Sequence, residues 1–380
     1  MQDTDPYPAS RSNELSENRI EQLTDWLRLQ EASGVGPFTA KLLLDVFGSP
    51  RAIFDAGHTA LAAHVKRPLA QALCAPPSPA IPSLLDAALA WAAQPGQQVL
   101  ALGDPGYPQI LADIPDPPLL LYIKGRAELL GARALAIVGS RNATVQGKAN
   151  ASSFARCLSQ DGIVIVSGLA LGIDAAAHEG ALDGAGSTVA VVGTGPDIVY
   201  PTRNRGLWER IARSGCIVSE YPPGTIPSAS NFPKRNRIIS GLSAGVLVVE
   251  AAARSGSLIT AHVAIEQNRD VFAMPGSIHA PLAKGCHTLI REGARLVDSI
   301  DDLREVLKLA PRSPLTVAAL PTETTCLGLL AHLGHEPIDI DTLLLRSGST
   351  VGALSLELLA LEMAGLLERL PGGKVQRVAC

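Results

Sequence analysis

The chain has few aromatic residues and no cysteine pattern that indicates a metal site or a disulfide framework. Its 380 residues include only six Phe, five Tyr and three Trp. The six cysteines are scattered and form no C-x-x-C pair, which favours reduced thiols in a cytosolic protein over a zinc site. The sequence also lacks a Walker phosphate loop, a metal-ligand cluster and a nucleophile elbow. We therefore expect no metal, no other cofactor and no motif-defined catalytic residue.

Long apolar runs and an overall positive charge are also missing. The most apolar stretches are short or interrupted by Gly, Asp and Arg, so we expect no membrane segment. The polar N-terminus predicts no signal peptide, and we expect a cytoplasmic protein. The formal net charge is −4, yet residues 133–298 hold 16 of the 32 basic residues and only 12 of the 36 acidic ones. A polyanion would therefore meet the middle of the chain.

The length and the changes of pattern along the chain predict three folded parts. The predicted parts are a disordered tail at 1–18, a helical domain at 19–95, a central domain at 96–308, a linker at 309–323 and a last domain at 324–380. In the helical domain, Gly34-Val35-Gly36 separates two amphipathic patterns, as in a helix-hairpin-helix unit that binds DNA phosphates. An ordinary turn between helices is favoured, because only Lys41 and Arg51 lie near.

In the central domain, short apolar runs alternate with helical patterns. Such alternation indicates buried parallel strands in a doubly wound α/β sheet, an extended Rossmann-like core. The predicted strands are Leu135–Val138, Ile163–Val166, Val189–Val192, Ile217–Val218, Val246–Val249 and Val271–Ala273. A further short strand is predicted at Leu119–Ile123, after a proline-rich stretch.

The last domain has the pattern of a winged helix. Helices are predicted at Cys326–Leu333, Ile340–Arg346 and Val351–Ala364, with a hairpin at Arg369–Val378. Acidic residues outnumber basic ones near the helix that would read DNA. This balance favours a role in protein contact or packing over a grip on DNA.

Glycine-rich loops follow the predicted strands and could hold phosphate groups. Gly139-Ser140-Arg141 follows the first strand, and its backbone N–H groups and guanidinium suit an anion. Ser167-Gly168 follows the second strand, and Ser255-Gly256-Ser257 stands at a helix start. A tight turn or an ordinary helix cap explains the glycines equally well, but a turn does not explain Arg141.

The segment from Asn231 to Arg237 combines cations with an aromatic ring, and no acidic residue occurs from Tyr221 to Val249. The cations neutralise phosphates, and the ring stacks on an unpaired base. Its candidate DNA-binding residues are Asn231, Phe232, Lys234, Arg235, Asn236 and Arg237. From these residues alone a second interpretation stays open, a solvated surface loop whose Phe packs inward.

Two weak catalytic patterns also occur. Asp174 and His178 stand one helical turn apart, and Asp174 could also cap the helix that it begins. Glu250 follows a buried strand shortly before the Ser-Gly-Ser segment. Acid–base chemistry is not favoured, because an Asp/His pair on a helix is common without catalysis.

Taken in order, the loop motifs resemble those of the DNA processing protein A (DprA/Smf) family. The resemblance is dense over residues 100–298 and weaker in the flanking domains. The matching motifs are Gly139–Arg141, Ser167–Asp174, Gly193–Gly195, Tyr200-Pro201, Asn231–Ser240, Ser255–Ser257, Glu266-Gln267, Pro275–Ser277 and Lys284–Cys286.

The resemblance implies a homodimer that binds single-stranded DNA cooperatively, shields DNA entering in natural transformation and loads the recombinase RecA. It implies no enzymatic activity. The implied DNA pocket holds Arg141, Phe232, Lys234 and Arg235, and Ser255–Ser257 is a further phosphate contact by the same resemblance.

An alternative is a nucleotide phosphoribohydrolase of the lysine-decarboxylase-like class, which has a similar core. Glu250 beside Ser255–Ser257 weakly resembles its glutamate and phosphate loop. The Pro-Gly-Gly-x-Gly-Thr run of those enzymes is absent from this sequence, and those enzymes lack the Asn-Phe-Pro segment. The single-strand binding function is therefore favoured.

Overall fold

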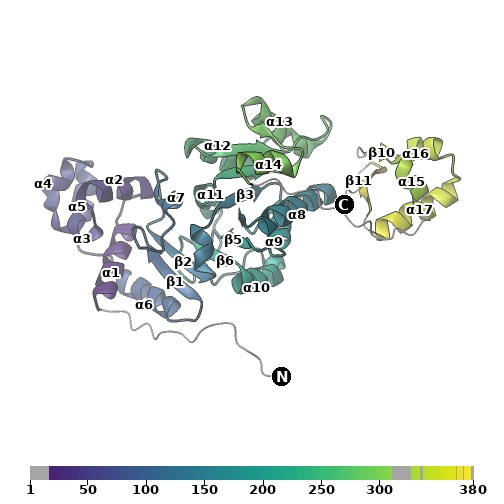
Figure 1. Ribbon diagram of the computed structural model, residues 1–380. Helices are drawn as coiled ribbons and strands as arrows, with labels where there is room; N and C mark the ends of the chain where they lie inside the picture. The colour runs from purple at the N-terminus through teal and green to yellow at the C-terminus, as the bar shows by residue number, and fades with distance from the viewer. Residues whose placement is uncertain (1–16, 310–326, 334–336, 365, 371, 378–380) are drawn as a thin grey trace, which may run out of the picture.

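The computed structural model describes residues 17–309, 327–333, 337–364, 366–370 and 372–377. Along the chain, a helical region is followed by a large α/β sheet and a small C-terminal domain (Figure 1). This architecture confirms the predicted fold class. The predicted tail and linker lie mostly outside the described residues, although the first helix already begins at Glu17.

Short helices that begin near prolines build the N-terminal region. They are α1 (Glu17–Glu31), α2 (Pro37–Phe47), α3 (Pro50–Asp55), α4 (Gly57–Ala62), α5 (Arg67–Leu73) and α6 (Ile81–Ala92). Four of them, α2, α3, α5 and α6, have Pro in the first turn, where no backbone N–H is needed. Leu27 of α1 and Trp91 of α6 share one core with Tyr122 of the central sheet. The helical region is therefore packed directly onto the sheet.

One sheet of nine strands forms the centre of the described chain. The strands are β1 (Gln97–Ala101), β2 (Leu120–Gly125), β3 (Ala134–Val138), β4 (Val164–Ser167), β5 (Thr188–Val191), β6 (Cys216–Ser219), β7 (Gly245–Val248), β8 (Asp270–Ala273) and β9 (Arg295–Leu296). Their spatial order is β1-β2-β6-β5-β4-β3-β7-β8-β9. Strands β3 to β9 are parallel, and β2 is antiparallel to both of its neighbours. All the predicted strands are present, whereas β1 and β9 were not predicted.

Helices cover both faces of this sheet because the side chains of each strand alternate between the faces. One face carries α8 (Val145–Gln160), α9 (Ile173–Ala181), α10 (Arg205–Ser214) and α14 (Ile300–Val306). The other face carries α7 (Gln109–Ala112), α11 (Asn231–Gly241), α12 (Gly256–Glu266) and α13 (Lys284–Arg291). Short 3-10 turns stand at Ala127–Gly131, Thr202–Asn204 and Pro281–Ala283.

The chain reverses its direction of winding at β3. Strands β4, β5 and β6 extend the sheet on one side of β3, and β7, β8 and β9 extend it on the other. The loops after β3 and β7 therefore run to helices on opposite faces, to α8 and α12. In open α/β sheets such a point leaves a crevice at the carboxyl ends of the strands.

The C-terminal domain is a small winged helix with its own apolar core. It contains α15 (Leu327–His332), β10 (Ile338–Asp339), α16 (Ile340–Ser347), α17 (Val351–Met363), β11 (Leu367–Leu370) and β12 (Lys374–Arg377). The carboxylate of Glu368 accepts hydrogen bonds of 3.1 and 3.2 Å from the backbone N–H of Val145. The domain thus contacts the first turn of α8 near the crevice.

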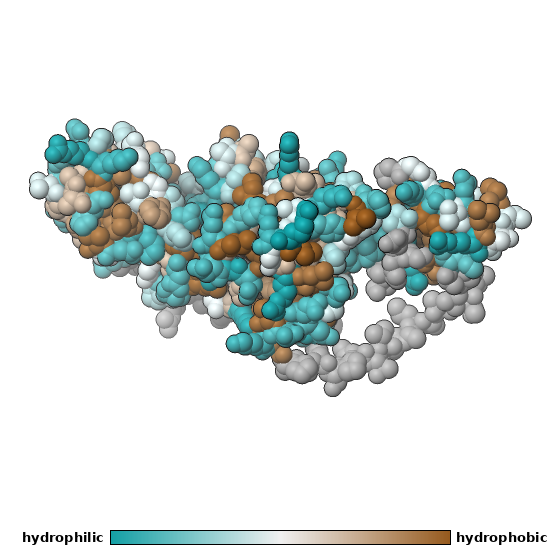
Figure 2. All heavy atoms as spheres, turned by 90° about the horizontal axis from the view of Figure 1, so that it is seen from above, coloured by the Kyte–Doolittle hydropathy of each residue, from teal (hydrophilic) through white to brown (hydrophobic). Residues whose placement is uncertain are grey.

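Within the described residues, no single helix is long and apolar enough to cross a bilayer. Helices α16 and α17 together have the length and apolar composition of a membrane span, but the chain bends by 109° between them. Leu343, Leu354 and Leu358 of this pair pack into the core of the winged helix. Seen from above, hydrophilic residues cover much of the molecule and apolar ones form separate patches (Figure 2).

Candidate nucleic-acid interface

A cavity of about 650 Å³ lies at the carboxyl ends of the strands, where the winding reverses. We call it the strand-end cavity. Its size falls within the range of about 300–1,000 Å³ that is usual for ligand sites. The predicted site residues that line it are Gly139, Ser140, Arg141, Phe232, Arg235, Asn236, Ser255, Gly256 and Ser257. Tertiary structure thus brings three of the four predicted segments together.

The surface-loop interpretation of Asn231–Arg237 is wrong, because these residues begin helix α11. Pro233 stands in the first turn of α11. Backbone N–H groups in the first turn make no hydrogen bond within the helix, so proline, which lacks this group, is tolerated there. Further along, Ile238, Ile239 and Leu242 pack into the core against the sheet. The burial of this apolar face holds the cationic segment in a helix instead of a solvated loop.

Glu250, two residues beyond the end of β7, holds the backbone of the loop that carries Arg141. The carbonyl of Glu250 accepts a hydrogen bond of 2.7 Å from the N–H of Ser140. Its carboxylate accepts bonds of 3.0 Å from the N–H of Thr144 and 2.6 Å from the hydroxyl of Thr144. A Cβ at Gly147 would lie 2.4 Å from this carboxyl group, so only glycine leaves the space. Glu250 therefore holds the start of α8 and leaves Arg141 exposed over the cavity.

Arg235 is a buried cation in the lining of the strand-end cavity. Its side chain is 4% exposed, and its Nη1 donates a bond of 2.6 Å to the carbonyl of Val191. The Nε–H has no hydrogen-bond partner among the described residues. Burial lowers the pKa of Arg235 to about 10, while Asp174 opposes this shift and Arg141 adds to it. The guanidinium still carries its charge at neutral pH, so it contributes a positive charge to the lining of the cavity.

Gly168 supports Arg235 instead of lining the cavity. A Cβ at Gly168 would lie 1.9 Å from Nη1 of Arg235, so the guanidinium rests on the glycine backbone. Asp174 does not cap α9. Its carboxylate accepts bonds from the N–H groups of Gly168 (3.2 Å) and Ala170 (3.4 Å). Burial raises the pKa of Asp174, against the opposing effects of Arg235, these N–H groups and Arg141.

Ser167 and His178 are buried supports of the same loop. The hydroxyl of Ser167 donates a bond of 2.6 Å to the carbonyl of Ile137, so the expected DNA contact does not fit its position. His178 accepts from the N–H of Leu169 at 3.3 Å and lies 2.7 Å from the hydroxyl of Thr188. Burial, and to a lesser degree Arg235, lowers the pKa of His178 to about 3. A neutral, buried His178 serves as a structural residue.

The start of α12 forms another part of the cavity. The hydroxyl of Ser255 caps this helix by accepting a bond of 3.3 Å from the N–H of Ser257. The two hydroxyl groups lie 2.7 Å apart. Backbone N–H groups and the positive end of the helix dipole therefore meet the cavity beside Arg141 and Arg235.

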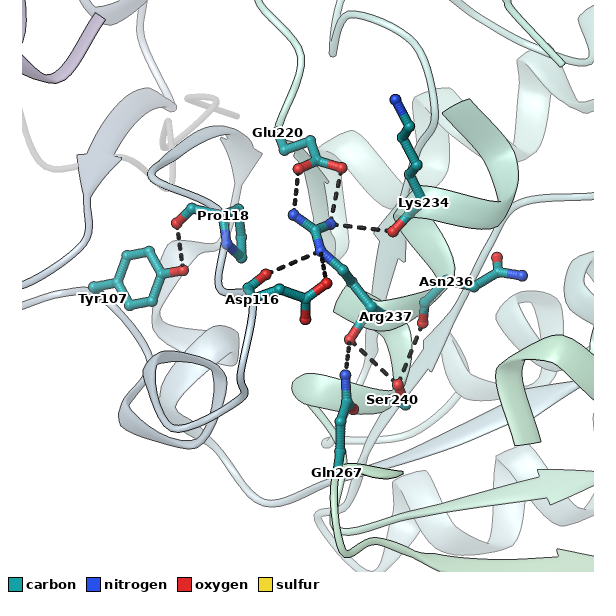
Figure 3. A network of polar contacts seen from close by, with 9 residues as sticks. All are labelled: Tyr107, Asp116, Pro118, Glu220, Lys234, Asn236, Arg237, Ser240 and Gln267. Carbon is teal, nitrogen blue, oxygen red and sulfur yellow. Dashed lines mark hydrogen bonds and ion pairs between the residues drawn. The ribbon is translucent and has the colours of Figure 1, made fainter. Parts of the chain in front are cut away.

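Arg237 occupies the opposite side of α11 and makes a buried ion-pair network (Figure 3). Its guanidinium donates two bonds to Glu220, of 2.6 and 2.9 Å. Its Nε lies 3.0 Å from the carbonyl oxygen and 3.1 Å from the carboxylate of Asp116. Gln267 donates to the backbone carbonyl of Arg237 at 3.0 Å. Arg237 is thus committed to structure, which corrects its predicted role as a DNA contact.

Lys234 also lies away from the strand-end cavity. It borders a second cavity of about 610 Å³, which Phe38 of α2 and Arg237 also line. Figure 3 shows its side chain pointing away from the Arg237 network. Pro233 lines both cavities. A ligand that touches Phe232 and Lys234 together must therefore cross the first turn of α11.

Comparison with known protein families shows which family this chain belongs to. Residues 98–308 match the model of DNA recombination-mediator protein A, and residues 311–373 match the DprA winged helix domain. The chain belongs to the DNA recombination-mediator protein A family. The predicted membership of the DprA/Smf family is confirmed.

Curated family members from distant bacteria share much of this sequence. Protein Smf of Escherichia coli is 40% identical over 78% of this chain and 82% of its own length. DNA processing protein DprA of Streptococcus pneumoniae is 50% identical over 53% of this chain and 71% of its own length. The match to the family model spans residues 98–308, which include the strand-end cavity.

Two solved structures of family members have the same architecture. The crystal structure of DprA from Streptococcus pneumoniae is 37% identical, with a TM-score of 0.61, and the match covers 76% of this chain and 99% of that one. The Helicobacter pylori protein is 32% identical, with a TM-score of 0.51, over 56% of this chain and 96% of that one. The Helicobacter pylori structure gives insight into the single-stranded DNA binding mode of that protein.

The sequence prediction of the site missed several lining residues. Tyr200, Pro227, Ser228, Ile259 and Thr260 join the strand-end cavity from segments that carry no charge pattern. Tyr200 stands in a family motif, which was the one available signal. Within the described part of the chain, no cluster of His, Cys, Asp and Glu could hold a metal ion.

The Arg237 network predicts different effects for two cations on one helix. We expect Arg237→Ala to lower the free energy of unfolding by about 3–5 kcal/mol, because it leaves Glu220 with an unpaired charge. Lys234→Ala, at an exposed position three residues earlier, should change it by less than about 0.5 kcal/mol. Urea unfolding followed by tryptophan fluorescence measures both. Equal stability of the two variants would contradict the structural role of Arg237.

Proposed function

We propose that this protein binds single-stranded DNA in the strand-end cavity and acts, without catalysis of its own, in DNA processing and natural transformation in the cytoplasm. The observation that carries the proposal is a single cavity lined by the exposed Arg141, the buried cation Arg235 and the start of α12. Arg141, Arg235 and Asp174 leave the lining with a net positive charge. Phosphate groups suit such a site, because charged donors and helix N-termini are their usual partners.

The aromatic ring in the lining of the cavity favours a single strand over a duplex as the ligand. The aromatic ring of Phe232 lies in the same cavity as Arg141, whose guanidinium carbon is 5.8 Å from the ring centroid. Stacking on a ring requires an exposed base, which a paired duplex does not offer. The single-stranded DNA binding mode of the Helicobacter pylori relative supports the same ligand for this chain.

Binding assays with short oligonucleotides test the proposal. We expect tight, salt-sensitive binding to oligo(dT) and much weaker binding to a duplex of equal length. Arg141→Ala should weaken oligo(dT) binding and reduce the slope of log K against log salt by about 1. Arg156→Ala is the matched control, because Arg156 is also exposed but lies on α8, about 16 Å along the helix axis from its first residue, Val145. Equal affinity for oligo(dT) and duplex at moderate salt would contradict the proposal.

The proposal includes loading of the recombinase RecA onto the bound strand. The family description as a recombination mediator and the resemblance to DprA support it. We expect the protein to shorten the delay before RecA hydrolyses ATP on single strands already covered by single-strand-binding protein. Arg141→Ala should lose this effect at protein concentrations where it no longer binds DNA. An unchanged delay with saturating wild-type protein would rule out loading.

The proposal also includes a homodimer through the central domain. Strand β9 lies at the edge of the sheet, and its Leu296 is 44% exposed, so the edge offers backbone groups and an apolar side chain to a second copy. Light scattering should give twice the 39.6 kDa of one chain. Leu296→Glu should shift the mass toward the monomer, and Leu345→Glu on the winged helix should not. A monomeric wild-type protein would contradict this part.

A further inference from the structure

The strand-end cavity is lined by two aromatic rings, Tyr200 and Phe232, and they differ in accessibility. Their centroids lie 5.4 Å apart, with planes inclined by 32°. The separation lies within the range of about 4.5–7 Å over which aromatic rings attract each other, and the pair is tilted. Tyr200 is 43% exposed, whereas Phe232 is only partly exposed. The outer ring of the pair is therefore Tyr200, which was not among the predicted site residues.

Phe232 is enclosed by its neighbours. A Cβ at Gly193 would lie 3.0 Å from Cδ1 of Phe232, so the ring packs against the backbone after β5. The neighbouring Asn231 donates a bond of 3.2 Å to the carbonyl of Gly193 and holds the start of α11 there. Arg141 and Tyr200 flank the same ring. These contacts make Phe232 the inner support of the pair.

The segment that carries Tyr200 is held on both sides. Before it, the carbonyl of Ile198 accepts a bond of 3.0 Å from the hydroxyl of Thr194. After it, the buried side chain of Asn204 donates bonds of 2.9 and 3.3 Å to the carbonyls of Leu169 and Ala170. Little conformational freedom of this segment would be lost on binding, so its ring suits a preformed platform.

We propose that Tyr200 is the platform on which a base of the bound strand stacks, with Phe232 as its support. This inference rests on the proposed single-strand binding function and names a residue that contacts the base. Ile259 of α12 is 44% exposed and lines the same cavity, so it supplies apolar surface for the same base. The ring interacts with any base, because every base has a π-face.

Affinity measurements with normal and abasic strands test the inference. Tyr200→Ala should weaken binding to oligo(dT) by about 5-fold to 150-fold, the range for loss of one stacked base. Tyr200→Phe keeps the ring and should bind as wild type does. The slope of log K against log salt should stay unchanged for both variants, since no phosphate contact is removed. On a fully abasic oligonucleotide of equal length, Tyr200→Ala and wild type should bind equally.

The double variant Tyr200→Ala/Phe232→Ala tests whether the two rings act as one unit. If Phe232 supports Tyr200, the two losses of affinity are not additive. Equal oligo(dT) binding by wild type and Tyr200→Ala would overturn the inference and leave the proposed function standing. An equal loss on normal and abasic strands would also overturn it, because it indicates a structural role. If the wild type binds no oligonucleotide, the proposed function fails and this inference fails with it.

Discussion

The site depends on the buried ion pairs that Arg237 makes with Glu220 and Asp116. Two carboxylates from distant segments, Glu220 after β6 and Asp116 before β2, neutralise the guanidinium beneath α11. A buried charge without partners costs several kcal/mol, so the pairing restricts where α11 can lie. The position of α11 in turn decides that Phe232 and Arg235 meet the strand-end cavity while Lys234 borders the other one.

The loops around the strand-end cavity are held by side chains that do not face it. Glu250 clasps the loop of Arg141, and His178 and Asn204 hold Leu169, whose φ of 57° is unusual for a residue with a side chain. The positions of these loops are thus fixed by hydrogen bonds within the protein. What stays available to a ligand is the exposed Arg141, the positive charge of Arg235, the start of α12 and the aromatic pair.

Much of the fold could be predicted because it depends on local patterns. The apolar runs at Leu135–Val138 and Val246–Val249 became β3 and β7, since a strand buried on both faces requires apolar side chains throughout. Strand β9 escaped prediction because it has two residues, both exposed. A surface loop stayed open as an interpretation of the start of α11 because its charges suggested solvent, and nothing local revealed that Arg235 and Arg237 are buried.

The sequence by itself determined the buried parallel strands, their glycine-rich ends, the positive middle of the chain and the family. These features depend on residues that are neighbours along the chain. Tertiary structure alone decided which side chains share a cavity: it joined Arg141 to Arg235 and Tyr200 to Phe232, and it separated Lys234 and Arg237 from them. The reason is physical, because burial and ion pairing act between segments far apart in sequence. The residues next to a position in the sequence do not reveal which distant residues it will contact in the folded protein.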